Sequence, residues 1–231
     1  MLKFLLSFIY YSIIIPLSSL FQPDCWSTSV QKILSHLRIQ HQFTKKAHLI
    51  PHGYILANHR SFFDFAIDPY LSKSTVIGRY YAFFAVAIFS ICGLIDKRII
   101  PFNRSKTGSH TAFHLMQKHM RKSGKYTKRI LFYPEGTRRH YNSLQSPEQF
   151  KENYLRYGLL KRVWEDGRLP VQLMLTSNKE LVFNEKKWVV NRGVNVRTIL
   201  GEPVYPRDFL RFEDFVDKIA EQWVTYYNEI H

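Results

Sequence analysis

Short strand-like runs alternate with longer segments of helical periodicity along most of this chain. The pattern predicts strands, each β-branched or alternating in polarity, at residues 52–58, 129–133, 169–175 and 193–200. It predicts helices at residues 109–124 and 212–230, where apolar side chains recur at helical spacing. Such alternation is typical of α/β folds. We therefore predict an α/β fold with a mixed β-sheet flanked by helices, in a chain of 231 residues that is long enough for one sizeable core.

The first forty residues predict two helices in succession. Residues 4–21 form an apolar run of 18 without a charge, which is near the lower limit for a membrane-spanning helix, and Pro16 is expected to kink it. Residues 27–39 follow with apolar side chains at helical spacing and with Ser27 or Ser29 as the cap. We predict a helix pair that dips into one face of a membrane. A single anchor helix and a cleaved leader are the alternatives.

A second apolar run occupies residues 80–95. As one helix it would measure roughly 24 Å, which is short of the ~30 Å hydrocarbon core of a bilayer. The sequence leaves two interpretations open, a buried core element and a further interfacial segment.

Positive charge is concentrated in one part of the chain. The net charge is +15, and twelve basic residues lie between Lys97 and Arg139 with a single acid, Glu135. Such a block attracts phosphate groups, and the alternative is a solvated basic face. The apolar share of 45% excludes a disordered chain. No nucleic-acid-binding motif is present, and Cys25 and Cys92 are too few for a disulfide framework.

A histidine and an aspartate five positions apart, His59 and Asp64, follow the predicted strand at 52–58. Because the chain holds ten histidines, this spacing carries little weight by itself. On one helix the two side chains would lie about 140° apart, so they can meet only if His59 precedes the helix. Ser61 as the N-cap would place Asp64 at N3 and so allow the contact. A carboxylate on Nδ1 would leave Nε2 as a base for an incoming alcohol.

A second motif follows the predicted strand at 129–133. In "PEGTRR", Gly136 permits a tight turn, Thr137 offers a hydroxyl and Arg138 offers a bidentate fork for phosphate. A third stretch, "PFNRSKTGS", places Arg104 before a helix whose N-terminus can receive an anion.

Together these stretches resemble the glycerolipid acyltransferases, the family of 1-acylglycerol-3-phosphate acyltransferases. "NHRSFFD" matches the N-H-x4-D block of that family, and "FYPEGTR" matches its F-P-E-G-T-R block. "GLIDKRIIPFNRSK" and "LPVQLML" resemble two looser blocks, and the resemblance covers roughly residues 50–206. It divides the chain into membrane-anchoring helices at 1–45 and a catalytic domain at 46–231.

The resemblance implies a role for each matching residue. His59 is the general base and Asp64 orients it. Substrate-binding residues, chiefly for the phosphate of the acyl acceptor, are Arg104, Glu135, Gly136, Thr137 and Arg138. The arginine of the intermediate block maps to Arg104, with Lys97 and Arg98 as alternatives, and Pro170 is expected to shape the acyl pocket.

The implied activity is transfer of a fatty acyl chain from acyl-CoA or an acyl carrier protein to lysophosphatidic acid, giving phosphatidic acid without an acyl-enzyme. The alternatives are another lysophospholipid or glycerol 3-phosphate as acceptor, and a catalytically silent lipid-binding protein. The resemblance places the active site at the cytosolic face of a membrane, the endoplasmic reticulum in a eukaryote or the inner membrane in a bacterium.

No cofactor or metal is implied. His110 and His114 lie four apart on a predicted helix, but no carboxylate or cysteine completes a metal site with them.

Overall fold

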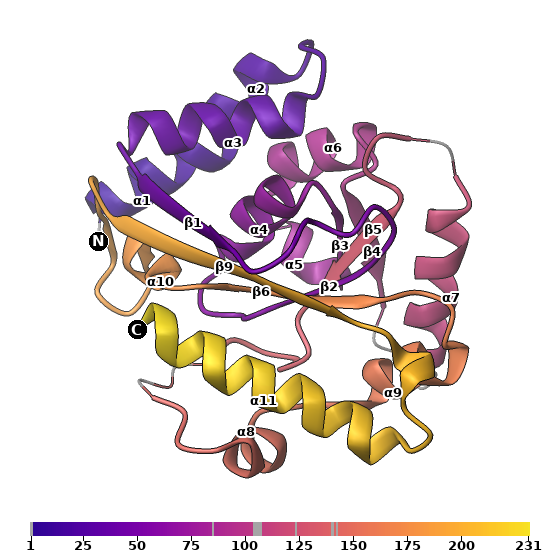
Figure 1. Ribbon diagram of the computed structural model, residues 1–231. Helices are drawn as coiled ribbons and strands as arrows, with labels where there is room; N and C mark the ends of the chain where they lie inside the picture. Colours follow the sequence, from indigo (N-terminus) through magenta and orange to yellow (C-terminus); the bar gives the residue numbers. More distant parts are fainter. Residues whose placement is uncertain (1, 85, 104–107, 123, 140, 142) are drawn as a thin grey trace.

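Seven strands form the central sheet within the residues that the computed structural model describes, 2–84, 86–103, 108–122, 124–139, 141 and 143–231 (Figure 1). In spatial order they are β1 (Gln40–Lys45), β9 (Asn195–Val204), β6 (Val171–Thr176), β2 (Gly53–Ala57), β5 (Arg129–Phe132), β3 (Thr75–Arg79) and β4 (Ile99–Phe102). From β6 to β4 the neighbours are parallel, whereas β9 is antiparallel to β6 and β1 is parallel to β9. The predicted α/β fold with a mixed sheet is therefore confirmed.

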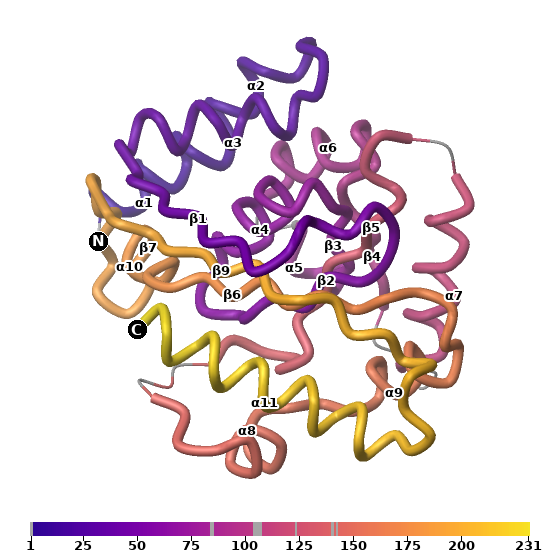
Figure 2. The backbone as a smooth tube through the Cα atoms, viewed as in Figure 1, coloured from indigo at the N-terminus to yellow at the C-terminus, as the bar shows by residue number. Residues whose placement is uncertain are grey.

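Helices cover both faces of the sheet, because successive strand residues point into two separate apolar cores. Tyr54 and Leu56 of β2 belong to one core, and Ile55 of the same strand belongs to the other. The first core is covered by α7 (Gly108–Met120), α8 (Pro147–Asn153), α9 (Tyr157–Asp166) and α11 (Phe212–Ile230). The second is covered by α3 (Cys25–His36), α4 (Asp64–Ser72), α5 (Tyr80–Phe84) and α6 (Ala87–Ile95). Figure 2 shows α8, α9 and α11 on one side of the strands and α3, α4 and α6 on the other.

Four short elements lie between β6 and α11 beside the long strand β9. They are α10 (Lys179–Val182), a hairpin of β7 (Phe183–Asn184) and β8 (Val189–Val190), and the 3-10 turn η2 (Pro206–Asp208).

The four predicted strands and the helices at 109–124 and 212–230 are confirmed, with shorter bounds for several of them. Three strands of the main sheet were not predicted. β1 is polar and half exposed, as an edge strand is, and β4 has only four residues, so neither gives a strong period-2 signal. The third, β3, is a five-residue strand directly before the apolar run at 80–95, and no element was predicted for its residues.

The N-terminal segment forms one helical rod from Leu2 to Ser19, comprising α1 (Leu2–Ile9), a π-helical turn η1 (Tyr10–Ile14) and α2 (Ile15–Ser19). The π turn ends two residues before Pro16, which has no N–H to continue the helical bonding. By length and composition this helix can cross a membrane. The predicted second helix, α3, begins earlier than expected: Asp24, not Ser27 or Ser29, is its cap, because the Asp24 carboxylate accepts the Ser27 N–H.

The apolar run at 80–95 folds as two short helices, α5 and α6, and its side chains divide between interior and surface. Phe83, Phe89 and Cys92 are buried in the second core. On the outside lie exposed apolar side chains, namely Tyr80, Tyr81, Ile91, Leu94 and Ile95. The interpretation as a core element is therefore confirmed for the inner side chains, and the interpretation as an interfacial segment stays a prediction for the exposed ones.

Candidate active site

Three loops that follow adjacent parallel strands meet at one edge of the sheet. β2 lies between β5 and β6 and is parallel to both, so the carboxyl ends of all three strands share that edge. His59 follows β2, Glu135 follows β5 and Lys179 follows β6. In open α/β sheets, ligands bind in the crevice outside the carboxyl ends of the strands.

Asn58 and Arg139 fix the loop that carries His59. The side-chain amide of Asn58 donates to the Thr176 carbonyl and accepts the Thr176 N–H, both at 2.9 Å, which ties the end of β2 to β6. From the other side, the Arg139 N–H donates to the His59 carbonyl at 2.8 Å, and the His59 N–H donates to Glu135. The backbone of His59 is thus bonded on both sides to the loop after β5.

The His59 and Asp64 side chains are in contact, with Nδ1 of His59 3.0 Å from Oδ2 of Asp64. Asp64 is fully buried, and its carboxylate also accepts the N–H groups of Arg60 and Ser61 and the Ser61 hydroxyl. Burial raises the pKa of Asp64, but the charge of Lys179 and the bonds from His59 and the backbone outweigh it and lower that pKa to about 2. Asp64 is therefore a fixed carboxylate at neutral pH.

The predicted position of His59, just outside the helix, is confirmed, but the predicted helix start is wrong. Helix α4 begins at Asp64 with Phe63 at the N-cap, so Asp64 is not at N3 below a Ser61 cap. The physical reason is that the Ser61 hydroxyl donates to the Asp64 carboxylate and accepts the Phe63 N–H, so residues 61–63 form a turn around the carboxylate.

Two buried residues that sequence reasoning missed, Lys179 and Asp68, lie behind the pair. The Lys179 ammonium is 2.7 Å from Oδ2 of Asp68 and 3.6 Å from Oδ2 of Asp64, and all three side chains have no exposed surface. Burial raises the pKa of Asp68 to about 7 against the opposing charge of Lys179. Burial lowers the pKa of Lys179, but the two aspartates outweigh it and raise that pKa. Asp68 lies one helical turn after Asp64, a spacing that could have been noticed, whereas nothing in the sequence connects Lys179 to this site.

Tyr133 lies against the other side of this cluster. Its ring stacks on the His59 ring with 4.4 Å between centroids and 18° between planes, and its hydroxyl donates to Asp68 at 3.2 Å. Burial raises the pKa of Tyr133 well above its ordinary value, so the hydroxyl keeps its proton.

The four residues of the "EGTR" motif divide between two positions. Glu135 is fully buried beneath the loop, where it accepts the His59 N–H and the Tyr141 hydroxyl, and burial raises its pKa to about 8. Gly136, Thr137 and Arg138 line the cavity described below. Gly136 has a left-handed φ of +70°, and a Cβ there would lie 3.2 Å from Cγ of Arg156. The structure thus places Glu135 under the His59 loop and the other three residues at the surface of the cavity.

A cavity of about 690 Å³ opens beside His59. Its walls are largely apolar, formed by Phe65, Val76, Ile77, Phe83, Phe102, Ala112, Phe132 and Leu159. Three arginines, Arg79, Arg138 and Arg156, also line it. Its volume is within the range of small-molecule sites, and an apolar wall with a few cations suits a ligand with a long hydrocarbon part and a phosphate.

Arg138 already has a partner within the protein, because its guanidinium forms an ion pair with Glu185. Glu185 follows β7 and also accepts the Phe62 N–H at 2.8 Å, so the hairpin is attached to the His59 loop. Arg79 and Arg156 have no ion-pair partner among the described residues. The sequence did not single out Arg79, Arg156 or Glu185, because they lie outside the recognised motifs.

The remaining predicted positions are mostly elsewhere. Arg104 lies outside the described residues. Arg98 lies at the amino end of β4, buried against the Tyr126 ring and bonded to the carbonyls of Pro69 and Ser74, and Lys97 precedes it. Both residues therefore lie beside the amino ends of the parallel strands, whereas His59 lies beside the carboxyl ends, and neither lines the His59 cavity.

Pro170 lies beside the amino ends of the strands, away from the cavity that it was predicted to shape. It precedes the amino end of β6, where its carbonyl accepts the Tyr54 N–H, and it does not line the cavity. Among the described residues no group of three histidine, cysteine or acidic side chains is arranged to hold a metal ion.

No protein-family model and no curated protein matches this chain. Among solved structures it is similar to the crystal structure of the 1-acyl-sn-glycerophosphate (LPA) acyltransferase PlsC from Thermotoga maritima. The two share 17% sequence identity with a TM-score of 0.65, over 99% of this chain and 92% of that chain. This chain therefore has the fold of an LPA acyltransferase, as its resemblance to the glycerolipid acyltransferases implies.

Proposed function

We propose that this protein is a membrane-associated glycerolipid acyltransferase, which transfers a fatty acyl chain from an acyl thioester to the hydroxyl of lysophosphatidic acid. The observation that carries the proposal is the 3.0 Å contact between buried Asp64 and His59, which lies on the wall of a largely apolar cavity that arginines also line. The same fold in PlsC, an LPA acyltransferase, supports it.

The chemistry uses His59 as a general base. With Nδ1–H donated to the ionised Asp64, Nε2 accepts the proton of the acceptor hydroxyl as that oxygen attacks the thioester carbonyl carbon. The tetrahedral intermediate then collapses, the carbon–sulfur bond breaks, and the thiolate takes the proton back from His59. Because the acceptor hydroxyl attacks the thioester directly, this route forms no acyl-enzyme, and its products are an ester and a free thiol.

The cavity provides separate surroundings for the two ends of the acceptor. The aromatic and aliphatic wall accommodates hydrocarbon, and Arg79, Arg138 and Arg156 bind phosphate oxygens. Thr137 and the Gly136 backbone provide further donors to the phosphate, and the resemblance to the glycerolipid acyltransferases implies that Arg104, which lies outside the described residues, also binds phosphate. Glu135 holds the His59 loop from below and does not itself bind phosphate.

The exposed apolar side chains of the N-terminal rod support the proposed membrane association. Leu2, Leu5, Leu6 and Leu17 are each at least half exposed. Helix α6, which packs against α2 and α3, adds exposed Leu94 and Ile95. These side chains insert into the interfacial region of a bilayer, and the net charge of +15 favours an anionic leaflet facing the cytosol.

The direct test is turnover by the purified protein in mixed micelles, with radiolabelled acyl-CoA or acyl carrier protein as donor. Acceptors compared are lysophosphatidic acid, other lysophospholipids and glycerol 3-phosphate. Phosphatidic acid as the dominant product supports the proposal. Vesicle binding without ester formation by any donor and acceptor would instead indicate a lipid-holding protein.

A further inference from the structure

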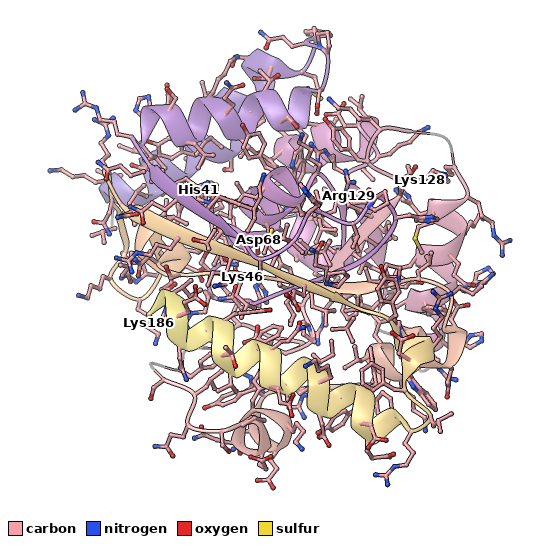
Figure 3. The ribbon with its side chains drawn as sticks, viewed as in Figure 1. His41, Lys46, Asp68, Lys128, Arg129 and Lys186 are labelled. Carbon is pink, nitrogen blue, oxygen red and sulfur yellow. The ribbon has the colours of Figure 1, made fainter. Side chains whose placement is uncertain are left out.

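Behind the catalytic pair lies a buried charge arrangement to which the mechanism above assigns no role. Lys179 and Asp68 have no exposed side-chain surface, although ionised groups are costly to bury unless they are paired. Asp68, labelled near the centre of Figure 3, is on α4, and Lys179 begins α10 beyond the end of β6.

Lys179 contacts Asp64 and the backbone directly before His59. Its ammonium donates to the Asn58 carbonyl at 2.7 Å, and Asn58 is the residue directly before His59. The same ammonium lies 3.6 Å from the Asp64 carboxylate. One side chain therefore holds the backbone that carries the base and also the carboxylate that orients it.

Asp68 completes the arrangement from the opposite direction. Its Oδ2 accepts Lys179 at 2.7 Å and the Tyr133 hydroxyl at 3.2 Å, and the Tyr133 ring stacks on His59. A contact path thus runs from the Asp64 side of His59 through Lys179 and Asp68 back to the face of the same imidazole.

We propose that Lys179 and Asp68 are positioning residues that set the orientation of the His59 ring; this inference rests on the proposed function. Lys179 holds Asp64 and the backbone before His59, and Asp68 holds Lys179 and the Tyr133 hydroxyl, whose ring stacks on His59. Loss of the Asp68 acceptor would release the Lys179 ammonium and the Tyr133 ring together, so the imidazole would no longer be fixed for the acceptor hydroxyl. Neither residue makes or breaks a bond in the reaction.

The other titratable groups that face this pair are Asp64 on α4, His59 after β2, and Tyr133 and Glu135 after β5. Tyr133 keeps its proton, and Asp64 keeps its charge. Asp68→Ala is the informative variant, because it removes the oxygen that accepts Lys179 and the Tyr133 hydroxyl. Asp68→Asn is the conservative variant, because its amide keeps an acceptor oxygen with almost no change in side-chain shape. Asp208→Ala, at an exposed aspartate of η2, is the matched control.

The test is the NMR spectrum of the His59 ring in histidine-labelled protein, assigned by its absence in His59→Ala, together with kcat and KM. A ring stacked on Tyr133 has its proton signals moved upfield, and we expect Asp68→Ala to remove that shift and to lower kcat about tenfold. KM for the acceptor should stay within about twofold, since Asp68 does not line the cavity. Asp68→Asn should restore the spectrum and kcat, and Asp208→Ala should change neither.

A second variant removes the other member of the arrangement. Lys179→Met should release the Asn58 carbonyl and Asp64, and it should likewise alter the His59 signals and lower kcat. Unaltered His59 signals in folded Asp68→Ala would overturn the inference, whether or not the protein turns over. Altered signals without any acyl transfer by the wild type would support the positioning role and refute the proposed function.

Discussion

Replacement of Asp64 by Asn tests both the stability and the chemistry of the site. One carboxylate oxygen, Oδ2, accepts the Arg60 and Ser61 N–H groups and the His59 ring N–H, and it lies 3.6 Å from the Lys179 ammonium. In Asp64→Asn the amide oxygen can still accept these bonds, but it carries no negative charge to pair with Lys179. Lowering the pKa of Asp64 from 3.8 to about 2 corresponds to roughly 2.5 kcal/mol of stability at neutral pH. We therefore expect Asp64→Asn to lose about 2 to 3 kcal/mol of unfolding free energy at pH 7.

The pH dependence fixes the origin of that loss. A carboxyl group whose pKa is lowered by folding stabilises the protein above its unfolded pKa and ceases to do so as the pH falls through its folded pKa. The difference in unfolding free energy between the wild type and Asp64→Asn should thus be constant above about pH 4 and should shrink between pH 4 and pH 2.

Urea unfolding monitored by tryptophan fluorescence measures the difference, with Asp208→Asn as the control variant. Turnover by Asp64→Asn should fall about 10²- to 10⁴-fold, because a neutral amide does not stabilise the imidazolium that forms when His59 takes the proton. A variant that is as stable as the wild type at pH 7, or equally destabilised at pH 7 and pH 3, would refute this account of Asp64.

Three further predictions concern the cavity, the membrane surface and Glu135. Arg156→Ala and Arg138→Ala should each raise KM for lysophosphatidic acid about tenfold, with little change for an acceptor without phosphate. The control Arg207→Ala, outside the cavity, should leave KM unchanged. Glu185→Gln should lower KM for lysophosphatidic acid, because it releases Arg138 from its ion pair. Leu6→Asp should reduce co-flotation with anionic vesicles. The control is Leu210→Asp, at an exposed leucine outside the N-terminal rod, and an equal loss from it would contradict the rod as the membrane-binding surface. Because burial raises the pKa of Glu135 to about 8, its contribution to stability is full below pH 4.5 and is lost as the pH rises toward 8. Glu135→Gln should abolish that decline in urea unfolding, and a decline that persists in the variant would exclude Glu135 as its source.

Local sequence patterns predicted the parts of the site that depend on chain proximity. His59 and Asp64 are five residues apart, and the need for His59 to precede the helix follows from helical geometry alone. The turn at Ser61 was not foreseen, because a free serine and a serine bonded to a nearby carboxylate look alike in a sequence.

The parts that depend on sheet order were beyond reach. Lys179 lies 120 residues after His59, and it reaches the site only because β6 pairs with β2. The predicted strands contained no information on which of them were neighbours. Similarly, Arg98 and Arg104 are equal candidates by composition, and only the direction of β4 shows that Arg98 lies at the opposite edge of the sheet.

Acyl transfer by wild-type protein and by His59→Ala, in the same micelles with labelled acyl-CoA and lysophosphatidic acid, tests the central claim most directly. The account predicts phosphatidic acid from the wild type and a loss of about 10²- to 10⁴-fold in kcat from the variant. KM should be nearly unchanged, because the base acts in the transition state and contributes little to ground-state binding. Turnover by folded His59→Ala at close to the wild-type rate would contradict it.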